Sequence, residues 1–287
     1  CGLEFCDSNT ATGAGAFPGS AVSPTAISFW PGINPGQRVL IAGRTTTTPR
    51  FGWTEDILAI SPTWSSNTTG LPASVTVVKL LKINPFDTND VLVTLNQNAG
   101  NGDEIWRNST VRSGGTWTKI FDQTSVGSPG ALTIQDISYT IAQTQLIYVS
   151  YSGAGVGQRC AHTHDNGATW TTVTLNAGQN AGGNIAVGQY NAQKVWVANG
   201  VNSSPDSVYR SSDGGHTFVQ ELVAAVDGTD TIILVPYQGN ASDTEALLFS
   251  TGSPGAIARS TDSGDTWSAY STPVFDHAHG SGIASDN

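Results

Sequence analysis

One eight-residue pattern recurs along the chain and restricts its fold more than any other feature. The segments 163–170 (THDNGATW), 211–218 (SSDGGHTF) and 260–267 (STDSGDTW) align residue for residue. They share Ser or Thr at position 1, Asp at position 3, Gly at position 5, Thr at position 7 and an aromatic residue at position 8. A fourth copy, 110–117 (TVRSGGTW), has Arg112 at position 3. The copies follow one another about every 50 residues, which indicates a repeat architecture.

Each octet has the residue types of a tight turn between two strands. The Asp carboxylate can accept hydrogen bonds from the amides of its own turn. Glycine at position 5 permits a positive φ that other residues resist. Threonine and an aromatic residue then favour the start of a strand. The octets are therefore predicted to close β-hairpins.

The residues between the octets supply further strands. Short segments rich in β-branched and aromatic residues precede and follow the octets, as at 206–210 and 170–175. Two more apolar runs complete a period, as at 185–188 and 194–198. Four strands in a period of about 40–50 residues form a β-propeller blade. Because helical periodicity is nearly absent, we expect an all-β fold.

The repeats predict a single β-propeller domain over residues 1–287. An irregular first blade without an octet spans about 21–73. The regular blades span about 74–123, 131–176, 177–226 and 227–273. Residues 274–287 resemble the first strand of another blade, and residues 1–20 would complete it, because an unclosed propeller leaves bare sheet edges. We therefore expect about six four-stranded antiparallel blades, or seven or more if the sequence is part of a longer chain.

The octets resemble the Asp-box, or BNR, repeats of a β-propeller superfamily. Its members include sialidases, xyloglucan-active endo-glucanases, sortilin-type receptors and photosystem assembly factors. The resemblance covers roughly residues 74–273 and is specific for the repeat, not for one function. In such propellers the Asp-box joins the third and fourth strands of a blade, on the side away from the active face. By this resemblance, the residues with a structural role are Asp165, Gly167, Trp170, Asp213, Gly215, Phe218, Asp262, Gly264 and Trp267.

The charge balance argues against one class of partner. The chain has 12 Lys and Arg against 22 Asp and Glu, a formal net charge of −10. A duplex-DNA binder needs a basic surface that releases counterions, so nucleic acid is not an expected partner. The apolar runs are also much shorter than the about 18–20 residues that a membrane-spanning helix requires.

Composition favours an extracellular location. Charged residues make up only 12% of the chain, about half the usual share, and its polar residues are largely Thr, Ser and Asn. We expect a secreted or cell-surface protein whose leader has been removed. The Asn-x-Ser/Thr sequons permit glycosylation only in a host that glycosylates. They lie at Asn67, Asn108, Asn202 and Asn240.

The three cysteines leave two questions open. Cys1, followed by Gly2, could carry the lipid of a mature bacterial lipoprotein, and the alternative is that the sequence merely begins there. Cys1, Cys6 and Cys160 are an odd number. They allow one disulfide and one remaining thiol, in a pairing that the sequence does not determine.

The residues fit one enzyme activity of such propellers better than another. A sialidase needs an arginine cluster for the substrate carboxylate, but Arg210 and Arg259 directly precede octets and are expected to be structural. A glycoside hydrolase needs two carboxylates about 5–10 Å apart. Asp136 and Asp230 begin predicted inner strands and could point into the central channel. They are the candidate catalytic residues.

Three tryptophans are candidates for ligand binding. Trp30, Trp53 and Trp64 all lie in the irregular first blade. An aromatic ring exposed on a loop rim could stack against a glycan, whereas tryptophans in such repeats also pack between blades. The sequence leaves both roles open.

The histidines raise the question of a metal site. Four of the five form two His-x-His pairs, His162 with His164 and His277 with His279. Alternate residues of a strand face the same side, so each pair could chelate a metal ion. Because His164 lies inside an octet, we instead expect ordinary polar roles. The sequence therefore predicts no metal and no cofactor.

Most recognisable motifs build the scaffold, so function must come from its loops and faces. The leading hypothesis is a non-enzymatic extracellular or cell-surface propeller that binds a protein or glycan partner, alone or within a larger surface assembly. The alternative is a glycoside hydrolase, or a domain of one, acting on a polysaccharide. A third hypothesis is an assembly factor like those of the photosystem relatives.

Overall fold

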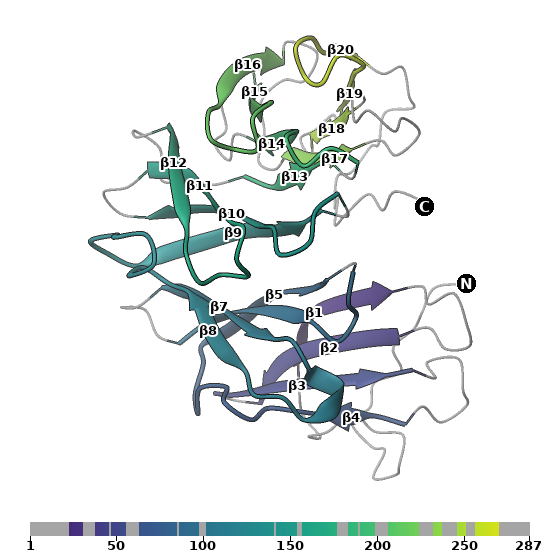
Figure 1. Cartoon of the computed structure of the whole chain (residues 1–287), viewed down its shortest axis with the longest axis vertical. Coiled ribbons are helices and arrows are strands. Elements are labelled where there is room, and N and C mark those ends of the chain that lie inside the picture. Colours follow the sequence, from purple (N-terminus) through teal and green to yellow (C-terminus); the bar gives the residue numbers. More distant parts are fainter. Residues whose placement is uncertain are drawn as a thin grey trace. The chain divides into compact units, whose positions relative to one another are not determined.

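The computed structural model describes residues 23–30, 38–45, 47–55, 63–84, 86–97, 102–140, 142–153, 157–176, 183–188, 190–198, 206–223, 232–236, 246–250 and 256–269. The chain divides into two compact units, Cys1–Asp122 (unit 1) and Gln123–Asn287 (unit 2). Both are built from four-stranded antiparallel sheets, in which strands consecutive in the chain are hydrogen-bonded neighbours (Figure 1).

Unit 1 contains two sheets. Sheet A consists of β1 (Ser23–Trp30), β2 (Arg38–Thr45), β3 (Thr48–Thr54) and β4 (Ser65–Ser66). Sheet B consists of β5 (Val77–Ile83), β6 (Val91–Asn96), β7 (Asp103–Asn108) and β8 (Thr118–Phe121). The octet 110–117, here called octet B, connects β7 to β8 and contains a short 3-10 helix, η1 (Val111–Ser113).

Unit 2 contains three sheets. Sheet C consists of β9 (Leu132–Tyr139), β10 (Ile147–Gly153), β11 (Gly157–Thr163) and β12 (Thr171–Asn176). Sheet D consists of β13 (Ile185–Val187), β14 (Val195–Ala198), β15 (Asp206–Ser211) and β16 (Val219–Val223). Sheet E consists of β17 (Ile232–Pro236), β18 (Ala246–Ser250), β19 (Ala256–Ser260) and β20 (Ser268–Ala269).

The octets connect the third and fourth strands of their sheets. Octet C (163–170) lies between β11 and β12, octet D (211–218) between β15 and β16, and octet E (260–267) between β19 and β20. The flanking strands pair in antiparallel register, as for Arg210 with Val219 and for Arg259 with Ser268. Each octet therefore closes a hairpin.

The expected all-β organisation in four-stranded antiparallel sheets is confirmed. The described residues form five such sheets and contain no α-helix. The expected sixth blade, formed by residues 1–20 and 274–287, lies outside the described residues. Within the described part of the chain, no helix has the length and apolar character needed to cross a bilayer.

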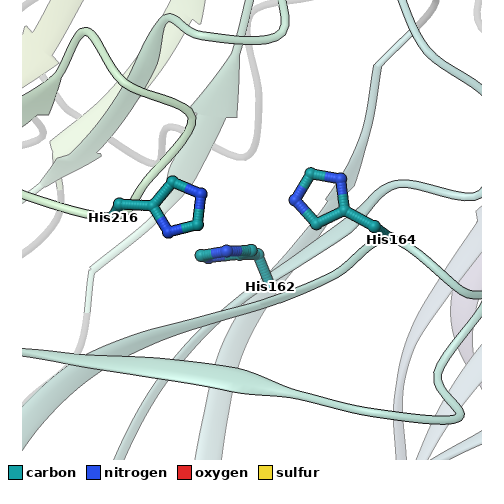
Figure 2. A group of neighbouring side chains, drawn as sticks. All are labelled: His162, His164 and His216. Atoms are coloured by element: carbon teal, nitrogen blue, oxygen red, sulfur yellow. The ribbon is translucent and has the colours of Figure 1, made fainter.

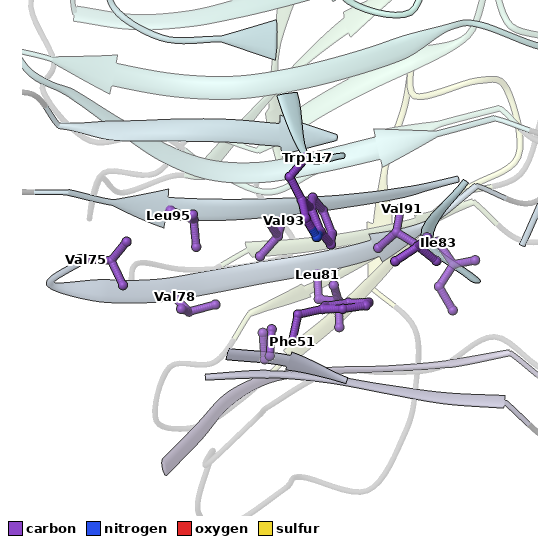
Figure 3. Packing of buried hydrophobic residues seen from close by; sticks show 12 residues of the cluster. Phe51, Val75, Val78, Leu81, Ile83, Val91, Val93, Leu95 and Trp117 are labelled. Atoms are coloured by element: carbon purple, nitrogen blue, oxygen red, sulfur yellow. The ribbon is translucent and has the colours of Figure 1, made fainter. Parts of the chain in front are cut away.

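The core of unit 1 joins sheets A and B. Phe51 of β3 packs with Leu81 of β5, Val93 of β6 and Trp117 of octet B in one buried cluster (Figure 3). The rings of Phe51 and Trp117 meet edge to face, with their centroids 4.9 Å apart. Full burial of an apolar side chain of this size contributes about 1.5–3 kcal/mol, so this aromatic pair is a principal contact between the two sheets.

The core of unit 2 has two layers because side chains alternate along β14. Val195 and Val197 pack with residues of sheet C, including Tyr148. Trp196 and Ala198 pack on the opposite face with residues of sheet E. Successive side chains of a strand point to opposite faces. The sequence of a central strand that is covered on both faces is therefore apolar throughout.

Candidate functional site

The three octets of unit 2 form the same hydrogen-bonded turn. In octet C, the Thr163 hydroxyl donates to Asp165 Oδ1 over 2.6 Å and accepts a hydrogen bond from the Gly167 amide. The Thr169 amide donates to Asp165 Oδ1, and Thr169 Oγ1 donates to Oδ2 over 2.6 Å. Octets D and E repeat these contacts around their own aspartates. Each carboxylate thus serves its own turn.

These hydrogen bonds favour the ionised carboxylates. At Asp165, donation from the threonines at positions 1 and 7 holds the pKa well below its usual range. At Asp213, burial alone raises the pKa, but hydrogen bonds from the residues at positions 7, 1 and 6 outweigh it and lower the pKa to about 2. The pKa of Asp262 is lowered by the same balance. Such values fit stabilisation of a turn, not proton transfer near neutral pH.

The glycines of octets D and E contact an aromatic residue of the preceding sheet. The Tyr148 hydroxyl donates to the Gly214 carbonyl, and a Cβ on Gly215 would lie 3.0 Å from the Tyr148 ring. Trp196 Nε1 likewise donates to the carbonyl of octet E at position 4, and a Cβ on Gly264 would lie 2.7 Å from that nitrogen. The octets therefore also connect adjacent sheets of unit 2.

Octet B is held by asparagines instead of an aspartate. The Thr110 amide donates to Asn108 Oδ1, and Asn108 Nδ2 donates to the Gly115 carbonyl over 2.7 Å. Asn67 Nδ2 donates to the same carbonyl, while the Asn67 carbonyl accepts from Trp117 Nε1 over 2.7 Å. Asn67 and Asn108 are two of the four sequon residues, and both side chains are buried.

One candidate catalytic residue, Asp136, is hydrogen-bonded to backbone amides. It is 8% exposed, and its carboxylate accepts hydrogen bonds from the amides of Ile137, at 2.8 Å, and Ile185, at 3.2 Å. Because Ile185 begins β13, Asp136 connects sheet C to sheet D. The second candidate, Asp230, lies outside the described residues.

The buried carboxylates in sheet B and directly beside its strands lie in ion pairs. Asp90 receives a bidentate contact from Arg107, with nitrogen–oxygen distances of 2.7 and 2.9 Å. The other pairs are Lys79 with Asp103, and Lys119 with both Glu104 and Asp122. Buried carboxylates are normally paired with cations in this way, so a structural role explains these contacts.

Unit 1 has a surface hollow at the edge of sheet A. The hollow has a volume of about 400 Å³ and is lined by Trp53, Thr54, Glu55, Thr63, Ser65 and Arg112. Arg112, at position 3 of octet B, is 2.6 Å from Glu55, and both side chains are more than a third exposed. The residue that replaces the octet aspartate therefore contributes a cation to this hollow.

The three candidate tryptophans have different places in the structure. Trp53 in β3 borders the hollow and also packs against the core of unit 1, so it contacts the core and remains accessible from the hollow. Trp64 is half-buried directly before β4 and does not line the hollow. Trp30 ends β1, but its side chain lies outside the described residues.

Three histidines of unit 2 come together (Figure 2). His162 in β11 and His164 directly after it meet His216 from octet D, and one ring nitrogen from each lies within 4.8 Å of the others. Burial, reinforced by His216 and His164, lowers the pKa of His162 to about 4. The sequence shows His162 and His164 as a His-x-His pair, but no local pattern links His216 to them. His277 and His279 lie outside the described residues.

Cys160 is a buried free thiol in β11. Burial raises the pKa of this thiol, which favours its protonated, unreactive form. Cys1 and Cys6 lie outside the described residues.

The comparisons with known proteins identify the fold. No family model matches the sequence, and no curated protein matches it. The structure "YCF48 bound to D1 peptide" has a TM-score of 0.54 at 16% identity, over 88% of this chain and 68% of that one. YCF48 from Cyanidioschyzon merolae gives 0.53 at 13% identity, over 84% and 71%. A GH74 xyloglucanase from Xanthomonas campestris gives only 0.34 at 16% identity, over 88% and 41%.

At these identities the likeness concerns fold alone. The YCF48 matches cover most of the chain, and the sheets of the chain have the strand order of propeller blades. The chain is therefore a β-propeller of four-stranded antiparallel blades, as the repeats predicted.

Proposed function

We propose that the chain is a non-enzymatic propeller that binds a protein partner, and that the hollow of unit 1 receives a segment of that partner. The observation that carries this proposal is the lining of the hollow, which combines Trp53 with the exposed Glu55–Arg112 pair. Tryptophan and arginine are the residue types enriched at the energetic centres of protein interfaces.

The hollow suits a short peptide segment. Its volume of about 400 Å³ lies within the range of small-ligand pockets, and the exposed Ser65 adds a hydroxyl group to the lining. An exposed ion pair contributes at most about 1 kcal/mol. A partner carboxylate could therefore replace Glu55 on the Arg112 guanidinium, which binds carboxylates in a bidentate manner.

The same lining disfavours hydrolysis. Retaining and inverting glycosidases both need two carboxylates about 5–10 Å apart. Among the described residues that line the hollow, Glu55 is the only carboxylate. Asp136 is bound by two backbone amides, which leaves it poorly placed to donate a proton to a substrate. Glycoside hydrolysis is therefore the second candidate.

The fold and the octets support the remaining parts of the proposal. YCF48, whose fold is similar, has been solved with a D1 peptide, so a propeller of this kind can bind a peptide. The turn contacts of octets C, D and E are those expected of Asp-box repeats, and they support our further proposal that the octets are repeats of this kind. We also propose a secreted or cell-surface location, because the low share of charged residues in the chain is typical of such proteins.

The test is selection of a displayed peptide library against the wild-type protein, followed by affinity measurement with Trp53→Ala and Arg112→Ala. Loss of an interface hot spot costs about 2 kcal/mol or more, which is about 30-fold in Kd. We expect each variant to weaken the selected peptides by that order. Tyr190→Ala, which removes an exposed aromatic ring in unit 2, is the matched control and should bind like the wild type.

A polysaccharide panel separates the alternatives. Binding of a glycan without new reducing ends, lost in Trp53→Ala, would change the partner from protein to carbohydrate. Release of reducing ends that disappears in Asp136→Asn would overturn the non-enzymatic proposal. Equal peptide affinity in Trp53→Ala, Arg112→Ala and Tyr190→Ala would show that the peptide binds outside the hollow.

A further inference from the structure

We propose that His162, His164 and His216 form a binding site for Zn²⁺ or a similar divalent transition-metal ion that joins sheet C to sheet D (Figure 2). All three residues belong to unit 2, so this site is independent of the hollow in unit 1. His162 comes from β11, His164 from the start of octet C and His216 from octet D. The site therefore draws its ligands from two sheets that are adjacent in the propeller.

The first argument is the state of the His162 side chain. It is 1% exposed, and neither ring nitrogen has a hydrogen-bond partner. Buried polar side chains are nearly always hydrogen-bonded, and an unsatisfied one requires a specific explanation. A metal ion bound at one of these nitrogens supplies a partner for that nitrogen.

The second argument is the arrangement of the rings. His162 lies edge-on to both other rings, with centroids 5.3 Å from His164 and 4.8 Å from His216, and those two are nearly parallel. Two nitrogens bound to one tetrahedral Zn²⁺ lie about 3.3 Å apart. Because His164 and His216 are exposed, small rotations of these two side chains can close the present separation of up to 4.8 Å.

The third argument is the equivalent junction between sheets D and E. His162 lies at position 0, directly before octet C, and His164 lies at position 2 of octet C. His216 lies at position 6 of the next octet, octet D. The same positions at the D–E junction are Arg210, Ser212 and Asp265. There Arg210 forms an ion pair with Asp265. The repeat thus brings positions 0 and 6 together at both junctions, so the approach of His216 to His162 follows from the blade geometry.

The two junctions differ in what can hold them. The D–E junction has a cation and an anion that attract each other directly. At the C–D junction the corresponding residues are three imidazoles, which in their neutral form cannot form an ion pair. Neutral imidazole is, however, a strong ligand for Zn²⁺, Ni²⁺ and Cu²⁺. A bound cation would take the place of the ion pair.

The ligand set also indicates the class of metal. Three imidazoles suit Zn²⁺ and its neighbours in the first transition row, whereas Ca²⁺ and Mg²⁺ prefer oxygen ligands. The side-chain amide of Gln143 lies 3.3 Å from His164 Nδ1. With its oxygen turned to the ring, this amide accepts the Nδ1 proton and leaves Nε2 for the metal, as outer-shell partners commonly do. The fourth position would be open to water.

The experiment is calorimetric titration of the full chain with ZnCl₂. The background carries His277→Asn and His279→Asn, which removes the other His-x-His pair. We expect one bound ion per chain, an increase in Tm with Zn²⁺, and the visible absorption of tetrahedral Co²⁺ when CoCl₂ is used instead. His216→Gln should weaken Zn²⁺ binding by more than the about 10–100-fold that loss of an outer-shell partner causes. Its Tm without metal should stay unchanged, because His216 is exposed.

Two further variants make the result specific to the junction. Ser212→Ala changes the equivalent position at the D–E junction and should leave Zn²⁺ binding unchanged. His162→Arg with His216→Asp transfers the Arg210–Asp265 pair into the C–D junction and should keep the Tm while removing the response to Zn²⁺. Absence of Zn²⁺ binding by the background protein, or equal affinity in His216→Gln, would overturn the proposal.

Discussion

Octet B of unit 1 and octets C, D and E of unit 2 build one hairpin turn in two ways. In unit 2 an aspartate inside the turn collects the hydrogen bonds of positions 1 and 7. In unit 1 the aspartate is absent, and the buried residues Asn67 and Asn108 bind the turn from outside it. The two units therefore share the hairpin connection, although different residues stabilise it.

The aromatic residue at position 8 changes together with the aspartate. Trp267 of octet E is half-buried, and its indole nitrogen donates to Gly264 in its own turn. Trp117 of octet B is 1% exposed, and its indole nitrogen donates to Asn67, 50 residues away. The indole of octet E is therefore bonded within its own turn, whereas the indole of octet B bonds to a distant residue of unit 1.

The largest expected difference concerns the glycine at position 5. Gly264 and Gly114 both have positive φ, +91° and +82°, but only Gly264 has no space for a Cβ. Gly114→Ala should cost about 1–2 kcal/mol for the left-handed backbone alone. Gly264→Ala should cost a further about 1–3 kcal/mol, because its Cβ would overlap Trp196. Urea unfolding measures both, and equal losses would show that the D–E junction yields to the extra atom.

Acid should distinguish the two kinds of octet next. The folded-state pKa values of Asp165, Asp213 and Asp262 are lowered, to about 2 at Asp213, from an unfolded value of about 3.9. Between these values the unfolded chain binds more protons, so the stabilisation is complete above about pH 5 and is lost as pH falls towards about 2. Octet B has no carboxylate at position 3 to titrate.

Urea midpoints measured between about pH 5 and about pH 3 test this difference. The triple variant Asp165→Asn/Asp213→Asn/Asp262→Asn should begin less stable than the wild type and lose less stability on acidification. The control Arg112→Asp places an aspartate in octet B. It should not stabilise unit 1, because it removes the Glu55 pair and leaves two acids side by side. An unchanged pH slope in the triple variant would contradict this account.

The smallest effect is expected at the threonine of position 7. Thr266 donates to Asp262 Oδ2 over 2.5 Å, and Thr266→Val should cost about 0.5–1.5 kcal/mol for this exposed charge-assisted hydrogen bond. Thr116 of octet B is exposed and has no aspartate at position 3 of its octet. Thr116→Val should therefore stay within about 0.5 kcal/mol of the wild type. The same urea series measures both, and a loss at Thr116 would reveal a second role for that position.

The sequence predicts the fold well because the octet is a local motif. The hydrogen bonds that its aspartate accepts span at most four residues, as between Asp165 and Thr169, so the residues of the octet and their spacing are sufficient to recognise the hairpin. The continuous apolar run of β14 likewise follows from coverage on both faces. The alternation of Val195 and Val197 with Trp196 becomes clear only when the neighbouring sheets are in place.

The candidate sites are harder to predict because each joins distant parts of the chain. The sequence indicates Trp53 as a candidate, but Arg112, which lines the same hollow, stands out only as an exception to the octet pattern. No local pattern links His216 to His162 and His164, although the three residues align to positions 6, 0 and 2 of the octets. What sequence alignment lacks is the knowledge that position 0 of one blade meets position 6 of the next, as Arg210 and Asp265 do.

The asparagines of octet B have a consequence for biosynthesis. Asn108 is a sequon residue, and its Nδ2, the atom to which an N-linked glycan is attached, donates to Gly115 and is buried in the fold. In a glycosylating host, sugar transfer and hairpin closure compete for this one nitrogen. A chain that receives the sugar first cannot complete the turn. Glycan occupancy at Asn108 would therefore measure the fraction of chains that were glycosylated before the hairpin closed. A host that does not attach N-glycans gives every molecule the same route to the folded state.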